Sequence, residues 1–436
     1  MRRVLIVSPH FPPVNGADMH RVRLSLPYFA EFGWQPIVLA VRPEDVEGVQ
    51  DPLLVETVPE TIPVRRVRAI PLRWTRRVAV GALALRAYPF LLRAGAALIS
   101  EHQPALVYFS TTVFPAMTLG RMWKRRFGVP YVLDMQDPWV SDYSQGKRGN
   151  LKSRLARSLH AVLEPWTMRE AGGLMAVSAD YISTLRRRYP WLADRPACTL
   201  PFGVSAKDFD LALKVPQPNR FFRAGDGRIH GAYVGRGGND MARALRILFL
   251  ALRRGLKERP ELFSRVRLHF IGTDYAPLGR ERKTIEPVAR ELGVGEFVAE
   301  HPLRVPYFEA LQILLQSDFL TVPGSDDPQY TASKIYPYIL AKKPLLAVFH
   351  RNSSVVPVLE ATRSGQAVTF ESETDNDEVA ASLFAKWTGL LQALPFTPDT
   401  DWQAFEPYTA REMTRRQCEL FDAVVAADVC RWELSG

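Results

Sequence analysis

The chain has 436 residues, of which 47% are hydrophobic and 23% are charged, and this composition excludes a disordered or fibrous protein. The length exceeds what one hydrophobic core organises, so we expect two or three domains. The net charge of +10 favours anionic partners such as nucleotides, sugar phosphates or lipid headgroups, although the arginines can equally be solvated surface residues.

The cysteines indicate the redox compartment of the protein, and the apolar segments indicate whether it is secreted or spans a membrane. Three cysteines, Cys198, Cys418 and Cys430, are too few for a disulfide framework and favour a reducing compartment. The apolar run at 4–7 is too short for a signal peptide, and the stretch 78–100 is interrupted by charged residues and a proline. We therefore expect a cytoplasmic protein without a membrane-spanning helix.

Short apolar runs alternate with helical patterns through the first half of the chain. Residues 4–7 read Val-Leu-Ile-Val, a continuous apolar run typical of a strand that is buried on both faces. Such alternation predicts a parallel sheet covered by helices on both sides. We expect strands at 4–7, 36–41, 64–70, 105–110, 130–134 and 173–177, and helices at 19–33, 78–100, 114–127, 151–171 and 179–189.

A segment rich in proline, glycine and charge, 201–226, interrupts this alternation and predicts an interdomain linker. A second alternation follows, with strands expected at 231–234, 266–271, 319–322, 345–349 and 367–370, and helices at 242–256, 282–292, 307–316, 333–341, 379–394 and 409–429. We predict two doubly wound α/β domains, at 1–205 and 229–404, joined by a linker at 206–228. Ligands of such sheets bind at the carboxyl ends of the strands.

The loop after the first strand, from His10 to Asp18, contains Gly16 and three prolines. Glycine lets the backbone approach a ligand closely, and the following helix offers free N–H groups. The alternative is an ordinary proline-rich turn, because the loop lacks the GxGxxG pattern of dinucleotide-binding proteins.

The strand at 130–134 ends in Asp134, and Asp137 and Trp139 follow in the loop. A carboxylate at such a strand end can accept a proton or a hydrogen bond from a substrate hydroxyl. An indole ring can stack on a sugar. We therefore predict an acceptor-binding site at Asp134, Asp137 and Trp139; the alternative is that Asp134 caps a turn and Trp139 belongs to the core.

The second domain opens with a strand followed directly by Gly235, Arg236 and Gly237. A flexible backbone beside a guanidinium suits a pyrophosphate, because the guanidinium can bind phosphate oxygens in a bidentate manner. The alternative is a glycine turn with an exposed arginine.

The stretch 321–344 runs from a buried strand through a polar loop into a helix. Free N–H groups near Thr331, the hydroxyl of Ser333 and the ammonium of Lys334 together predict a phosphate-binding site. The alternative is an ordinary capped helix.

Other patterns exclude several kinds of chemistry. Histidines and cysteines do not occur at metal-ligand spacing, so we expect no metal site, and no Walker loop or GxSxG elbow is present. The arginines are spread along the chain without a stacking-aromatic module, which argues against nucleic acid as a partner. The basic and apolar stretch Arg65–Arg93 can hold the protein on an anionic membrane surface; the alternative is a packed helix with a basic rim.

The order and spacing of these motifs resemble GT-B glycosyltransferases, most closely the retaining, nucleotide-sugar-dependent family 4-like group. The segment 201–204, PFGV, resembles the family's "PNGVD", and 134–139, DMQDPW, resembles "DxRDxW". The segment 333–348, SKIYPYILAKKPLLAV, resembles "SKxYEYLAxGKPV", and the last helix resembles the tail that returns to the first domain. The resemblance covers nearly the whole chain. It implies two Rossmann-like domains that face an interdomain cleft, with residues 405–436 packed on the first domain.

The resemblance also implies site residues. Ser333 and Lys334 would contact the donor pyrophosphate near Thr331, and Arg236 would serve the same phosphates. Arg236 and Lys334 would then stabilise the leaving diphosphate. Gly16 would let the first loop approach the donor sugar or acceptor.

Asp137 would lie on the acceptor side of the reaction. The family carries a glutamate that binds the ribose hydroxyls of the donor where this chain has Pro337, and many members carry another that faces the sugar where this chain has Gln329. Asp326 and Asp327 are near enough in sequence to substitute.

The implied function is metal-independent, retaining transfer of a sugar from a UDP- or GDP-linked donor, without a further cofactor. The hydroxyl acceptor would be a glycan or a lipid-linked glycan in bacterial cell-surface polysaccharide or glycoconjugate biosynthesis, on the inner face of the membrane. The alternative is a non-catalytic GT-B-like scaffold in a glycan assembly system, which the replaced glutamates favour.

Overall fold

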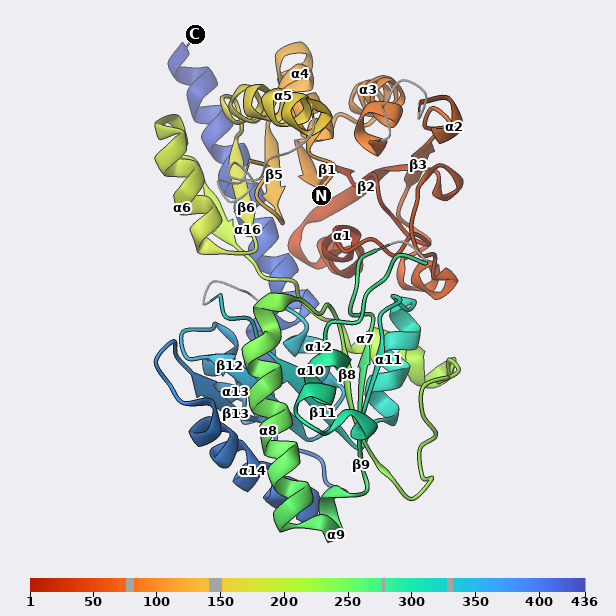
Figure 1. Ribbon diagram of the computed structural model, residues 1–436. Coiled ribbons are helices and arrows are strands. Elements are labelled where there is room, and N and C mark those ends of the chain that lie inside the picture. The colour runs from red at the N-terminus through yellow and green to blue at the C-terminus, as the bar shows by residue number, and fades with distance from the viewer. Residues whose placement is uncertain (76–81, 141–150, 277–278, 328–331, 436) are drawn as a thin grey trace. The chain divides into compact units, whose positions relative to one another are not determined.

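The computed structural model describes residues 1–75, 82–140, 151–276, 279–327 and 332–435 (Figure 1). The chain divides into two compact units. The first unit comprises Met1–Gly203 and Tyr408–Gly436, and the second comprises Val204–Pro407.

The first unit is built on a sheet of seven parallel strands in the order β3-β2-β1-β4-β5-β6-β7. The order runs in opposite directions from the neighbours β1 and β4, so the switch point of this doubly wound sheet lies between them. The strands are β1 (Arg2–Val7), β2 (Trp34–Val41), β3 (Val64–Val67), β4 (Leu106–Ser110), β5 (Tyr131–Met135), β6 (Gly173–Ala176) and β7 (Ala197–Thr199).

Successive residues of β1 supply two different cores. Val4 and Ile6 pack into one, and Leu5 and Val7 into the other, because neighbouring side chains of a strand point to opposite faces. Figure 1 shows the helices of the first unit on both sides of its sheet. One face is covered by α3 (Leu83–His102), α4 (Thr118–Phe127), α5 (Leu151–Met168) and α6 (Ala179–Arg188), and the other by α1 (Met19–Ser25), η1 (Phe29–Phe32) and α16 (Ala410–Ser435).

The C-terminal helix α16 returns to the first unit, as the resemblance predicts. Its Phe421 is fully buried and packs edge-on against Trp34, with ring centroids 5.4 Å apart. The hydroxyl of Ser25 donates a 3.0 Å hydrogen bond to Gln417 of the same helix. Residues near both ends of the chain therefore share one core.

The second unit contains six parallel strands in the order β10-β9-β8-β11-β12-β13, with its switch point between β8 and β11. The strands are β8 (Ile229–Val234), β9 (Val266–Ile271), β10 (Val298–His301), β11 (Phe319–Pro323), β12 (Leu345–His350) and β13 (Gln366–Phe370). Its helices are α7 (Ala206–Lys214), α8 (Ala242–Glu258), α9 (Pro260–Phe263), α10 (Glu286–Glu291), α11 (Tyr307–Gln316), α12 (Ile335–Leu340), α13 (Val355–Thr362), α14 (Asn376–Ala393) and α15 (Trp402–Phe405).

Short helical segments complete the chain. They are α2 (Leu72–Thr75), η2 (Pro43–Asp45), η3 (Pro52–Thr57), η5 (Phe114–Met117), η7 (Pro190–Leu192), η8 (Asn239–Met241), η9 (Gly295–Phe297) and η10 (Glu406–Tyr408). The structure confirms the predicted doubly wound α/β architecture.

Several elements differ from the sequence prediction. The helix expected at 19–33 is interrupted after Ser25, because Pro27 has no N–H to continue the hydrogen-bond ladder. The segment expected to be a linker contains α7, whose Phe209 is buried, so this segment belongs to the second unit. The sequence analysis also missed β7, β10 and α13.

One helix among the described residues, α3, is long and apolar enough to cross a membrane by length and composition. Its Leu91, Leu98 and Ile99 are buried in the core on one face of the sheet. The apolar stripe of α3 is thus explained by packing within the first unit.

Candidate active site

The switch point of the second sheet brings a glycine loop against a lysine. Gly235 follows β8 directly, and Lys334 lies in the turn before α12. A Cβ at position 235 would overlap the end of the Lys334 side chain, so a larger residue here would displace the lysine. The two motifs that the sequence predicted for phosphate binding therefore meet at one place.

The ammonium of Lys334 is buried without an anion. Among the described residues, Nζ has no hydrogen-bond partner, and it lies 5.5 Å from the centre of the Tyr233 ring. Burial, and then the positive charges of Arg236 and Arg304, lower the pKa of Lys334 to about 7. A group in this state binds a negative ligand strongly, because the ligand supplies the missing charge and hydrogen bonds.

Arg236 is already engaged by a carboxylate. Its Nη1 and Nη2 atoms donate hydrogen bonds of 3.0 and 2.7 Å to the two carboxylate oxygens of Asp240. Asp240 also accepts a 2.7 Å bond from the hydroxyl of Ser325, and the hydrogen bond from Arg236 holds its pKa below the usual value. Asp240 thus occupies the guanidinium that was expected to bind phosphate in a bidentate manner, and the phosphate contact of Arg236 stays a prediction.

Tyr338 fixes α12 to the end of β8. Its hydroxyl accepts a 2.6 Å hydrogen bond from the backbone N–H of Val234 and lies 3.2 Å from the carbonyl oxygen of the same residue. Gly237 is held in the same way from the other side, since its N–H donates a 2.7 Å bond to the Thr273 carbonyl. These contacts set the position of the loop relative to the lysine.

The start of α12 differs from the prediction. The helix begins at Ile335, after a turn that contains the half-buried Ser333, and Thr331 and Gln329 lie outside the described residues. Pro337 lies in the first helical turn, where a missing N–H costs no intrahelical bond.

The switch point of the first sheet carries a histidine–aspartate pair. Nδ1 of His10, in the loop after β1, lies 2.9 Å from Asp18 at the start of α1. Asp18 is buried and accepts three more bonds of 3.1 to 3.2 Å, from the Thr111 hydroxyl and from the N–H and hydroxyl of Thr112 after β4. The pair therefore bridges the loops that follow β1 and β4.

The two partners shift each other's protonation. Burial opposes protonation of His10, but the hydrogen bond and charge of Asp18 raise its pKa above the usual value. Burial also opposes ionisation of Asp18, but His10 and the threonine loop hold the pKa of that carboxyl below its usual range. The surrounding protein, and then the charge of Asp18, raise the pKa of the exposed Asp137.

Asp134 does not reach the surface, so its predicted contact with an acceptor is wrong. Its carboxylate is fully buried and lies 2.8 Å from Nε of Arg21. It also accepts hydrogen bonds of 2.8 and 3.0 Å from the hydroxyls of Ser110 and Tyr108. Arg21 in turn donates a 2.6 Å bond to the Leu200 carbonyl, so Asp134 holds the interior together.

Trp139 belongs to the core, so its predicted stacking on a sugar is also wrong. The residue is 5% exposed, its ring stacks on Phe114 at 5.5 Å, and its indole N–H donates a 3.1 Å bond to His160. Asp137 is the one residue of this predicted acceptor site that is exposed.

Residues 20–203 match the model of the glycosyl transferase 4-like domain. The chain has the GT-B fold and carries a glycosyl transferase 4-like domain. No curated protein matches the sequence.

Solved structures support the GT-B assignment of the fold. HepE from Anabaena, in complex with UDP and glucose, is 15% identical with a TM-score of 0.56, covering 97% of this chain and 100% of its own. The α,α-trehalose 6-phosphate synthase from Burkholderia multivorans is 14% identical with a TM-score of 0.57, covering 98% and 100%. A glycosyltransferase from Rickettsia africae is 13% identical with a TM-score of 0.55, covering 97% and 98%.

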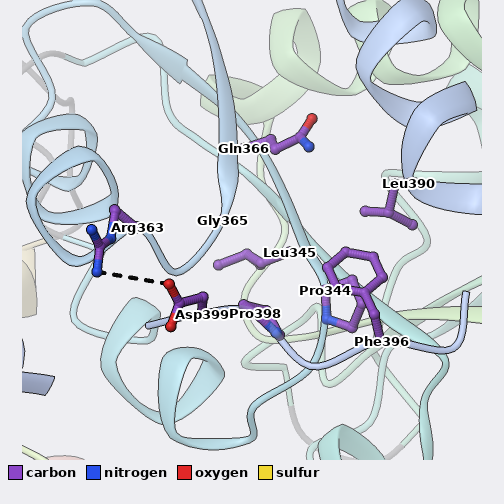
Figure 2. A pocket seen from close by; sticks show the side chains of 9 residues that line it. All are labelled: Pro344, Leu345, Arg363, Gly365, Gln366, Leu390, Phe396, Pro398 and Asp399. Carbon is purple, nitrogen blue, oxygen red and sulfur yellow. Dashed lines mark ion pairs between the residues drawn. The ribbon is translucent and has the colours of Figure 1, made fainter. Parts of the chain in front are cut away.

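Two further observations concern metal binding and a hollow away from the switch points. Within the described ranges, no three His, Cys, Asp or Glu side chains are placed to hold a metal ion. Arg363 and Asp399, whose charged atoms lie 3.9 Å apart, are among the residues that line a hollow of about 160 Å³. Figure 2 shows these side chains. The hollow lies at the amino ends of β12 and β13, the opposite ends of the strands from the glycine loop and Lys334.

Sequence reasoning missed the His10–Asp18 pair and the role of Asp240. The sequence analysis selected both loops for their glycines, but the contacts to His10 and Arg236 are made by the acidic residues that follow, Asp18 and Asp240. A signal was present, since an aspartate just before or within the first turn after a glycine loop is well placed to bind a neighbouring basic side chain.

Proposed function

We propose that this GT-B chain is a glycosyltransferase that moves a sugar from a nucleoside diphosphate donor to a hydroxyl acceptor. The observation that carries the proposal is the buried ammonium of Lys334, which has no hydrogen-bond partner among the described residues and lies against Gly235 at the switch point of the second sheet. A diphosphate would give this cation its anion and would raise its pKa from about 7.

The proposed chemistry is stabilisation of the leaving group. As the bond between the sugar and the diphosphate breaks, negative charge grows on the phosphate oxygens, and a positive group already in place lowers the energy of that state. Lys334 supplies a direct contact, while Arg236 and Arg304 add positive charge nearby. Gly235 leaves room for the phosphates to approach the backbone.

The donor and the stereochemical course are further parts of the proposal. UDP is the first nucleotide to test, because HepE, which shares the fold, was crystallised with UDP and with UDP-glucose; GDP is the second. From the resemblance we carry over retention of the anomeric configuration, independence of metal ions and a glycan or lipid-linked acceptor of bacterial surface polysaccharides. The anomeric proton of the product in NMR, and activity in EDTA, test the first two.

A thermal-shift panel of UDP, GDP and their glucose and mannose derivatives tests donor binding. A ligand at 100 times its Kd adds about 2.7 kcal/mol of stability. We expect one nucleotide to raise Tm in the wild type and to leave Lys334→Met unchanged. No shift with any nucleotide would contradict the proposal, and binding without transfer or hydrolysis would favour the non-catalytic scaffold.

We also propose that the protein works in the cytoplasm, on the anionic inner face of a membrane, through an exposed surface around α2 and α3. Trp74 is 65% exposed and Leu85 is 41% exposed, and the neighbouring Arg65, Arg68 and Arg93 are exposed. Basic residues beside exposed apolar ones favour an anionic lipid surface.

Arg86 is excluded from this surface. It is buried and donates bonds of 3.0 and 3.1 Å to the carbonyls of Ile70 and Asp45. Arg76 and Arg77 lie outside the described residues.

Sedimentation with vesicles of 30% phosphatidylglycerol should capture the protein at low salt, and Trp74→Ala should reduce capture. Equal capture by pure phosphatidylcholine vesicles would contradict the membrane proposal.

A further inference from the structure

In the histidine–aspartate pair of the first unit, one ring nitrogen of His10 contacts Asp18 and the other has no hydrogen-bond partner among the described residues. Nδ1 of His10 lies 2.9 Å from both carboxylate oxygens of Asp18. In the neutral ring this nitrogen therefore carries the hydrogen and donates a hydrogen bond to the carboxylate. No described group hydrogen-bonds Nε2, and the side chain is 22% exposed. The neutral ring therefore presents a lone pair to solvent.

The surroundings hold this orientation from three sides. The buried Asp18 is fixed by Thr111 and Thr112, which follow β4. The side-chain amide of Gln136, just after β5, donates a 3.1 Å bond to the Asp18 carbonyl. Gly16 makes the pair possible, because a Cβ there would lie 2.9 Å from Asp18 Oδ1 and 3.2 Å from the His10 Cβ.

This place is also where a ligand is expected on the first unit. His10 follows β1 and the threonines follow β4, the two strands between which the strand order reverses. In open α/β sheets, ligands bind outside the carboxyl ends of the strands at that point. The sequence analysis assigned Gly16 to this loop but gave His10 no role.

We infer that Nε2 of His10 binds the acceptor, by accepting a hydrogen bond from its attacking hydroxyl. The inference rests on the proposed function, whose acceptor site it locates on the first unit. Asp18 is a positioning residue that fixes the ring. A lone pair held in one direction suits a carbohydrate, whose hydroxyls donate hydrogen bonds.

The assignment makes acceptor binding depend on pH. Only the neutral ring can accept a hydrogen bond, and Asp18, the charged group that faces the ring, favours the protonated form. Asp137 faces Asp18 from the end of β5, and the residues from the β4 loop are uncharged. The acceptor KM should therefore be lowest above the raised pKa of His10 and should increase as the pH falls through it.

The experiment uses the full chain, with UDP-glucose as donor and octyl β-glucoside or octyl α-mannoside as acceptor. His10→Gln should raise the acceptor KM at least tenfold and leave the UDP thermal shift and the slow hydrolysis of UDP-glucose unchanged. His102→Gln, a similarly exposed histidine at the end of α3, is the matched control. Asp18→Asn should keep the ring but move the rise in acceptor KM to lower pH.

A second measurement does not need turnover. In ¹⁵N-histidine NMR spectra, Nε2 of His10 should be the bare nitrogen above neutral pH, and either glycoside should shift its resonance. Equal losses of donor hydrolysis and acceptor use in His10→Gln would overturn the inference, as would an Nε2 resonance that neither glycoside moves. A wild type whose Tm is raised by none of the nucleotides would instead contradict the proposed function, and the NMR titration would still decide the role of His10.

Discussion

Charged groups near the carboxyl ends of the strands differ between the two units in whether they have a partner of opposite charge. In the first unit the carboxylates of Asp18 and Asp134 are buried against His10 and Arg21, each within 2.9 Å. In the second unit Lys334 is buried without a hydrogen-bond partner in the described part of the chain. Each of these carboxylates has a basic side chain beside it without any ligand, whereas Lys334 has no anion beside it.

This difference separates structural charges from charges that await a ligand. A buried pair stabilises the fold only while both partners are present, because removal of one leaves the other uncompensated. A buried cation without a partner costs stability in the free protein and recovers that cost when an anion binds. Burial alone therefore does not identify a binding residue; a buried charged group with neither a counter-charge nor a hydrogen bond is the stronger indication.

The largest effect on stability is expected for the buried pair of Asp134 and Arg21 in the first unit. Asp134→Ala should lower the free energy of unfolding by about 3–5 kcal/mol, because Arg21 would remain buried without its carboxylate. Urea unfolding measures this loss. Glu371→Ala, which removes the exposed partner of Arg351, is the control and should cost about 1 kcal/mol or less. Equal small losses in both variants would remove the distinction between the two pairs.

The opposite result is expected at Lys334. Lys334→Met should reduce sugar transfer by about 10²–10³-fold, since one group that stabilises developing charge is lost. It should leave Tm equal or higher, because a buried amine is replaced by an apolar side chain of similar length. Lys257→Met, at an exposed position of α8, should change neither quantity. A variant that loses stability and keeps activity would show that Lys334 is structural.

A smaller effect is expected at Gly16. Gly16→Ala places a methyl group against Asp18 and His10, so we expect a few-fold rise in the acceptor KM and a loss of about 1 kcal/mol in stability. Gly389→Ala, with no atom within 4 Å of the added Cβ, lies inside α14 and should stabilise by about 0.5–1 kcal/mol. Full acceptor affinity in Gly16→Ala would show that the pair tolerates displacement.

The sequence was sufficient for most strands of the two sheets, and it placed Gly235 and Lys334 in segments that follow strands. Buried parallel strands are continuous apolar runs, and β1, β4, β5, β8 and β9 were found on that signal. The meeting of Gly235 with Lys334 followed from the rule that strand ends share one edge. The edge strand β10 was missed because Val-Ala-Glu-His is neither a continuous apolar run nor an alternation of apolar and polar residues. Its buried Glu300 is compensated by hydrogen bonds from 273 and 284–286 that no local pattern shows.

The partners of charged groups could not be read from the sequence. Asp134 and Asp137 are three residues apart, yet one is fully buried beside Arg21 and the other is exposed. Arg21 is more than a hundred residues away from Asp134 in the chain, so the pairing depends on the tertiary fold. Arg236 is a different case, because Asp240 is only four positions away and the sequence analysis considered this loop for phosphate binding alone.

Proton uptake during UDP binding at pH 8.0 tests the central claim most directly. Lys334, with a pKa of about 7, is mostly neutral at that pH, and a bound diphosphate should protonate it. Calorimetry in two buffers of different ionisation enthalpy should show uptake of close to one proton by the wild type and none by Lys334→Met. Binding of UDP to the wild type without proton uptake would contradict the claim that Lys334 is the cation that awaits the diphosphate.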